Sequence, residues 1–98
     1  MPSRHTIAFF VSQDNDCPVE TYLFDGKNET DFELIIAVIQ RLAHAGQALI
    51  DTDMAKHIDG PIFELRKNRH RIMYAEDKKL NRFVMLSAFI KNTKKTPL

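Results

Sequence analysis

Cysteine is scarce in this chain, with Cys17 as the single thiol among 98 residues. One thiol cannot form an internal disulfide, and small secreted domains generally depend on several. Asp14, Asp16 and Pro18 surround Cys17 in sequence, and acidic neighbours make a thiol a poor nucleophile. We therefore expect a protein of a reducing compartment, the cytoplasm, in which Cys17 does not act as a nucleophile.

Long apolar runs are also missing from the sequence. No stretch approaches the roughly 20 apolar residues that a membrane span needs. The start of the chain leads into a short apolar run, Ile7 to Val11, whereas a secretory signal requires a longer one. The sequence therefore predicts a soluble protein without a membrane partner.

Familiar catalytic and cofactor motifs are absent as well. Gly26, Gly46 and Gly60 stand alone, so there is no phosphate-binding loop. The four histidines are scattered without the spacing of metal ligands, and we predict neither a metal nor a cofactor. His57 and His70 remain open as acid–base groups because histidine titrates near neutral pH, although most lone histidines only pack or face solvent.

Charge is plentiful but unevenly divided. The net charge of +1 hides an acidic part, residues 1–60, and a basic part, residues 61–98. The basic part holds ten Lys/Arg and three Asp/Glu, a balance of +7, and the acidic part holds four and ten, a balance of −6. A basic surface of this kind suits a polyanion such as RNA. Lysine-rich strand ends also serve to keep a small sheet soluble.

The pattern of apolar residues predicts a single α+β domain. Alternating or continuous β-forming runs predict strands at 6–12, 62–66, 70–76 and 82–90, with helices near 18–24 and 30–46. Thr30 and Glu33 have the spacing of a capping box, and Gly46 is a natural helix stop. Residues 49–59 are expected to form a connection with weak helical character. We expect an antiparallel sheet of about four strands with two N-terminal helices on one face, in the order β-α-α-β-β-β.

Period-two alternation groups three charged side chains on one face of this sheet. Glu64, Arg66 and Arg71 share a face and would converge across a hairpin. Arginine suits phosphate because its planar donors bind two oxygens at once. The other interpretation is that Glu64 simply pairs with Arg66 or Arg71, which is worth little at a solvated surface.

Three motifs together resemble those of a known family. They are Phe63-Glu64-Leu65-Arg66, Arg71-Ile72-Met73-Tyr74, and a C-terminal run from Leu86 through Phe89-Ile90-Lys91 to Lys95-Thr96-Pro97. They resemble the HigB-like, phage-derived branch of the RelE/ParE toxin superfamily, and the likeness extends over nearly the whole chain. The resemblance implies the toxin of a type II toxin–antitoxin system.

The resemblance also implies an activity and partners. Toxins of this kind cut messenger RNA on the ribosome without a metal, as the ribose 2′-hydroxyl attacks the scissile phosphate. The expected partners are a cognate antitoxin, typically a small helix-turn-helix protein, and ribosome-bound mRNA. Two alternatives remain, a gyrase poison of the ParE kind and a catalytically inactive module that binds antitoxin or RNA.

Site residues follow from the same motifs. Arg71 matches the arginine that contacts the scissile phosphate, Arg66 matches the arginine of the Glu-Leu-Arg motif, and Lys91 matches the first basic residue after the last strand. These three are the expected catalytic residues. The expected RNA-binding residues are Lys94, Lys95, Arg69 and Lys67.

Two departures from the family pattern are visible. Asn92 stands where a second basic residue is common, and the sequence stops at Leu98 without the C-terminal helix that often follows. No general base is identified. His70 points to the opposite face of a regular strand, and Glu64 beside two arginines is a weak base.

Overall fold

The computed structural model describes residues 5–91, and the predicted RNA-binding residues Lys94 and Lys95 lie outside that range. The described residues form β1 (Thr6–Phe9), α1 (Pro18–Leu23), the 3-10 helix η1 (Gly26–Asp31), α2 (Phe32–Ala45), the 3-10 helix η2 (Gly46–Asp51), β2 (Ala55–Asp59), β3 (Ile62–Lys67), β4 (His70–Asp77) and β5 (Arg82–Ile90). The predicted α+β class is confirmed, and the last three strands begin where the sequence placed them.

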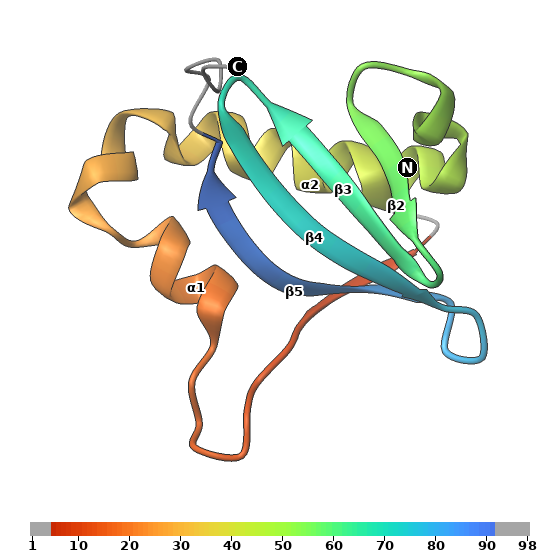
Figure 1. Ribbon diagram of the computed structural model, residues 1–98, viewed down its shortest axis with the longest axis horizontal. Helices are drawn as coiled ribbons and strands as arrows, with labels where there is room; N and C mark the ends of the chain where they lie inside the picture. Colours follow the sequence, from red (N-terminus) through yellow and green to blue (C-terminus); the bar gives the residue numbers. More distant parts are fainter. Residues whose placement is uncertain (1–4, 92–98) are drawn as a thin grey trace, which may run out of the picture.

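The strands of the described region form one mixed sheet with helices on one side. The order across the sheet is β1-β5-β4-β3-β2. Strands β2 to β5 are antiparallel neighbours, and β1 lies parallel to β5. In Figure 1, α2 crosses behind the sheet and α1 lies beside β5. We call the face turned away from α2, which carries Glu64, Arg66, Arg71 and Met73, the outer face.

Two features of the sheet differ from the prediction. Residues 49–59 were expected to connect a helix to a strand, but Ala55–Asp59 forms β2, an edge strand paired with β3. Its sequence is short and polar, and only its partner strand makes it recognisable. The sheet is also not purely antiparallel, because β1 pairs in parallel with β5, which lies far along the chain. The β1–β5 pairing depends on a non-local contact that no local pattern reveals, whereas β2 pairs with β3 directly across Gly60 and Pro61.

The apolar stripe predicted for the long helix does cover the sheet. Ile35, Ile39 and Leu42 are buried on α2. They belong to one core with side chains from three strands, Leu65, Ile72, Tyr74, Phe83 and Met85. By length and hydropathy alone the helical stretch Gly26–Ile50 would be long enough to cross a membrane. Its buried stripe is instead what the core helix of a two-layer domain requires.

The helix ends as predicted but does not begin as predicted. Gly46 follows α2 with φ of 63°, a conformation that strains other residues, and a Cβ at this position would come 2.8 Å from the His5 ring, which would have to shift. The capping box of Thr30 and Glu33 is wrong. Thr30 lies inside η1, the N-cap is Asp31, and its side chain makes no cap hydrogen bond. The Asp31 carboxylate instead lies 2.8 Å from His70 Nε2.

Candidate functional site

A tight hairpin brings the two predicted phosphate-binding arginines together. Strands β3 and β4 pair up to Lys67 and His70, which leaves Asn68 and Arg69 as the turn. Asn68 has φ of 54°, a left-handed conformation that asparagine tolerates better than most residues. With this register Arg66 lies directly opposite Arg71. The prediction that both arginines share one face is confirmed.

A carboxylate bridges the opposed arginines. Arg66 Nε donates to Glu64 Oε1 at 2.8 Å, and Arg71 Nε lies 3.7 Å from the same oxygen. Like charges directly opposite each other on a sheet are destabilising, and an intervening carboxylate offsets that repulsion. The predicted alternative, a pairing of Glu64 with Arg66 or Arg71, is therefore also present. The three side chains together carry a formal charge of +1.

The two arginines have different surroundings. The Arg71 side chain is 11% exposed, and its Nη1 donates to the carbonyl oxygens of Asn68 at 2.8 Å and His70 at 3.0 Å. Its guanidinium thus secures the turn of the hairpin. The Arg66 side chain is 31% exposed and donates only along its own strand among the described residues. Arg66 is the guanidinium with donors available to a ligand.

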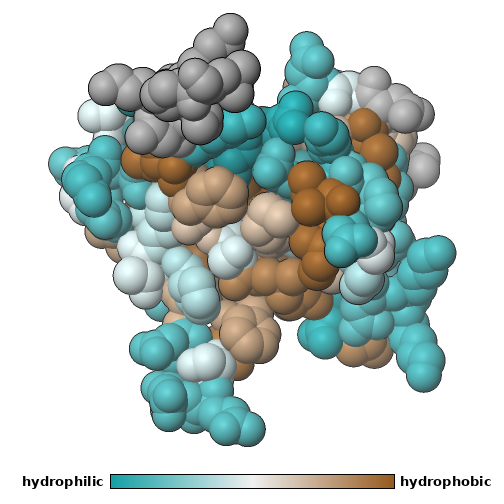
Figure 2. All heavy atoms as spheres, viewed as in Figure 1, coloured by the Kyte–Doolittle hydropathy of each residue, from teal (hydrophilic) through white to brown (hydrophobic). Residues whose placement is uncertain are grey.

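The centre of the outer face is apolar. Arg71 is opposite Phe89, and Glu64 aligns with Met73 and Ser87 across the three strands. Phe89 is 43% exposed. Figure 2 looks onto this face and shows an apolar centre between hydrophilic margins. The arginine cluster therefore borders an apolar floor on which a base or an apolar side chain of a partner can rest.

The three other predicted cations within residues 5–91 are distributed around the hairpin rather than gathered with the arginines. Lys91 is exposed, and its N–H donates to the Arg69 carbonyl at 2.7 Å, so the end of β5 lies beside the turn. Arg69 lines a hollow with Lys27, Asp31 and His70. Lys67 turns to the other side of the sheet and lines a hollow against α2. Lys67 is therefore not part of the outer face.

A second polar cluster, which the sequence did not predict, lies on the helix side of the same hairpin. His70 is 5% exposed. Its Nδ1 lies 2.6 Å from the Tyr22 hydroxyl and its Nε2 lies 2.8 Å from Asp31 Oδ2. Both ring nitrogens of His70 therefore have a hydrogen-bond partner. The cluster joins α1, η1 and β4.

The inner cluster combines a buried imidazole, His70, with two partly exposed partners, Tyr22 and Asp31. Burial raises the pKa of the Tyr22 hydroxyl, and the nearby Asp25 and Asp31 carboxylates raise it further. Tyr22 therefore stays protonated and acts as a hydrogen-bond donor rather than a nucleophile. The prediction that His70 faces away from Arg71 is confirmed by this position. Tyr22 and Asp31 are 48 and 39 residues from His70 in the chain. A local sequence motif therefore does not predict this cluster.

Comparisons with known proteins agree with this architecture. Residues 24–98 match the family described as Phage derived protein Gp49-like (DUF891). No curated protein matches the chain. Its fold is similar to a chain in the archaeal RelE-RelB complex of Pyrococcus horikoshii OT3, with a TM-score of 0.65 and 11% identity, over 92% of this chain and 98% of that chain.

A second solved structure shows the same arrangement. It is the toxin-antitoxin complex RelBE2 of Mycobacterium tuberculosis, with a TM-score of 0.51 and 15% identity, over 90% of this chain and 99% of that chain. At these identities the likeness is one of fold alone. The family match spans most of the chain, including the β3–β4 hairpin and its arginine cluster, and the protein therefore belongs to the phage-derived Gp49-like family.

Proposed function

We propose that this protein is the toxin of a type II toxin–antitoxin pair, of the HigB-like kind, and that it cleaves messenger RNA on the ribosome in the cytoplasm. The observation that carries the proposal is the pair Arg66 and Arg71, directly opposite each other on the open face of a RelE-like sheet. An open, cationic face with an apolar floor suits a single strand of RNA, whose phosphates and bases need these two kinds of surface.

The different surroundings of the two arginines support separate tasks for them. Arg66 is the more exposed and donates to the scissile phosphate, stabilising the charge that builds up on its oxygens in the transition state. Arg71 holds the turn that sets the position of Arg66 and Glu64. Lys91 and Arg69, which meet beside the turn, contact the RNA backbone on either side, and Lys94 and Lys95 extend that contact.

The reaction proposed is an internal transfer within the RNA. The ribose 2′-hydroxyl loses its proton to water as its oxygen forms a bond to phosphorus, the bond from phosphorus to the 5′-oxygen breaks, and that oxygen takes up a proton from water, so no net proton is gained or lost. The products end in a 2′,3′-cyclic phosphate and a 5′-hydroxyl. Glu64 Oε1 already accepts from Arg66, so Glu64 orients Arg66 rather than removing the 2′ proton. The ribosome would supply the bent RNA geometry that the attack requires.

The test is cleavage of a translated message in a reconstituted translation system, read by primer extension. Wild-type protein is expected to cut the message only when ribosomes translate it. Arg66→Ala is expected to lower the cleavage rate by about 10²-fold or more, in the range of removing one transition-state donor. Intact messages with wild-type protein, or equal cutting by Arg66→Ala, would contradict the proposal.

One observation favours a second candidate, a catalytically inactive binding module. Arg71 is committed to the turn carbonyls, and His70 is closed off on the other face. On this view the outer face binds antitoxin or RNA without cutting it. Normal growth on expression without a partner, together with RNA binding that is lost in Arg66→Ala, would support it. A gyrase poison of the ParE kind would instead block supercoiling and leave messages intact.

An antitoxin is the proposed partner under each of these functions. A helix with an apolar stripe and acidic flanks would cover the floor at Met73 and Phe89 and neutralise Arg66. Co-purification with the product of the neighbouring gene, and loss of that complex in Phe89→Asp, is the expected result. A complex that survives Phe89→Asp unchanged would place the antitoxin on another surface.

A further inference from the structure

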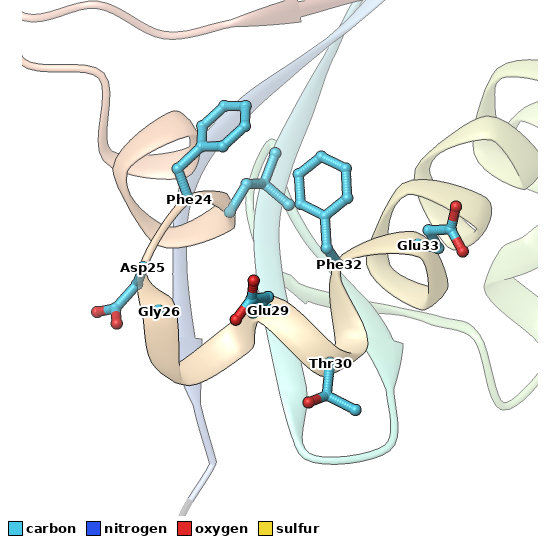
Figure 3. A pocket seen from close by; sticks show the side chains of 8 residues that line it. Phe24, Asp25, Gly26, Glu29, Thr30, Phe32 and Glu33 are labelled. Carbon is cyan, nitrogen blue, oxygen red and sulfur yellow. The ribbon is translucent and has the colours of Figure 1, made fainter.

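A second surface lies away from the outer face, where α1 ends and α2 begins. It is a hollow of about 450 Å³ with an apolar wall formed by Leu23, Phe24 and Phe32. Phe24 is 71% exposed, the largest fraction among the big apolar side chains of the described residues. Its ring centroid lies 5.4 Å from that of Phe32, at an interplanar angle of 37°. Figure 3 shows the two rings projecting to the same side.

The rim of this hollow is acidic. Asp25, Glu29 and Glu33 line it, and no lysine or arginine does so among residues 5–91. Figure 3 shows Asp25 and Glu33 on either side of the aromatic pair, with Glu29 between them. Asp25 accepts the backbone N–H of Lys27 at 2.9 Å. Within the described region, none of the three carboxylates forms an ion pair.

The combination of apolar wall and acidic rim restricts what can bind there. Three carboxylates repel a phosphate backbone, so this hollow is not an extension of an RNA-binding surface. They also repel an acidic segment of an antitoxin. A cationic side chain is attracted by the rim and by the faces of the two phenyl rings. An apolar side chain beside that cation would remove the exposed Phe24 ring from water.

We infer that this hollow docks a basic segment of a partner protein, in which one aliphatic side chain lies against Phe24 and Phe32 and flanking Lys or Arg residues pair with Glu29 and Glu33. The argument rests on charge complementarity and on the exposed aromatic wall. The docking inference does not depend on the proposed cleavage of RNA, so either proposal can fail without the other.

The direct test is an NMR titration of the 15N-labelled protein with a designed peptide that carries a central Leu-Ile pair flanked by lysines. Matched peptides replace the lysines with glutamates, or the Leu-Ile pair with serines. The inference predicts amide shifts concentrated in residues 23–33 for the basic apolar peptide, and about tenfold weaker binding for either matched peptide. Shifts spread over other surfaces, or equal binding of the glutamate peptide, would overturn it.

Two variants and a control sharpen the result. Phe24→Ala removes an exposed ring and should weaken binding by about tenfold without disturbing the fold. Glu29→Lys should weaken binding and flatten its salt dependence. Glu20→Lys makes the same change of charge on the exposed side of α1, outside the hollow, and should have little effect. Equal losses of peptide affinity in Glu20→Lys and Glu29→Lys would mean that the peptide responds only to the net charge of the protein, and would refute the docking site.

A second copy of this chain is the competing occupant, because its basic part could reach the acidic rim. Sedimentation of the free protein distinguishes a second copy of this chain from a separate partner protein. A concentration-dependent dimer that disappears in Phe24→Ala would assign the hollow to self-association and overturn the proposal of a separate partner. A monomer that binds the basic peptide would support it.

Discussion

Arg71 and His70 are adjacent in the chain, yet they belong to different environments. Arg71 lies on the outer face within a charged network with Glu64 and Arg66. His70 lies on the inner face, where Tyr22 and Asp31 occupy both of its nitrogens. The pleat of β4 separates the two side chains. One hairpin therefore carries the partly exposed charge of Arg66 on one side and contacts α1 and η1 through His70 on the other.

The two networks should also differ in what they contribute to stability. In the inner cluster the His70 imidazole is buried, so leaving it without partners carries a large desolvation cost, although the Asp31 side chain is 38% exposed. In the arginine cluster the Arg66 side chain is 31% exposed, so its ion pair with Glu64 is partly screened by water and salt. We therefore expect substitutions on the inner side to affect folding first, and those at Arg66 to affect ligand binding first.

The largest effect on stability is expected for His70→Ala. The substitution leaves the Tyr22 hydroxyl without its imidazole partner and opens a cavity under η1, at a cost of about 2–4 kcal/mol in the free energy of unfolding. Urea denaturation measures it. His44→Ala, at an exposed position on α2, is the matched control and should cost well under about 1 kcal/mol. Similar losses in both variants would show that the inner cluster has no special role.

The second-largest effect on stability is expected for a substitution of Glu64. Glu64→Gln removes the charge between two opposed arginines, and we expect a loss of about 1–3 kcal/mol because the carboxylate is largely buried. In an Arg66→Gln background the loss should shrink by about 0.5 kcal/mol or more, since one repelling cation is gone. Additive losses in the double variant would mean that Glu64 does not couple the arginines.

Alkaline pH tests the inner face in another way. Burial raises the pKa of Tyr74 to about 12, with a further contribution from Glu76. Above the unfolded pKa of about 10 the unfolded chain loses this proton while the folded protein keeps it. Stability should therefore be full below pH 10 and fall as the pH rises toward 12. The decline in melting temperature should be shallower in Tyr74→Phe, and an identical decline in both proteins would contradict the assignment.

The smallest effect on stability is expected for Arg66→Ala. A partly exposed ion pair contributes about 0–1 kcal/mol, and removing Arg66 also relieves its repulsion with Arg71. The unfolding midpoint should therefore change little, and less still at high salt. A loss above about 2 kcal/mol would make Arg66 a structural residue and leave the outer face without its exposed guanidinium.

Much of the fold was predictable because local patterns determine it. The strand from Arg82 to Ile90 follows from a run of apolar residues. The end of α2 at Gly46 follows from the positive φ there, which glycine adopts without strain. The strand Ala55–Asp59 and the parallel pairing of β1 were not predictable in this way. The partner of β1 is distant in the chain, and the strand Ala55–Asp59 is short with a largely polar sequence, so local composition does not identify either feature.

The candidate site also contains residues that a local pattern predicts and residues that only the folded chain brings together. Alternation placed Arg66 and Arg71 on one face because β3 and β4 are regular up to their turn. It also puts Lys67 on the other face, although Lys67 was grouped with the RNA-binding residues by charge alone. The inner cluster was missed because Tyr22 and Asp31 come from helical segments that only the folded chain brings to His70.

The matched pair Arg66→Ala and Lys67→Ala tests the central claim most directly. The two residues are neighbours on β3, the substitutions remove the same charge, and the side chains lie on opposite faces of the sheet. Measured as cleavage of a translated message, Arg66→Ala should lose activity by about 10²-fold or more, while Lys67→Ala should retain most of it. Equal activity in the two variants, whether both high or both low, would contradict an RNA site on the outer face.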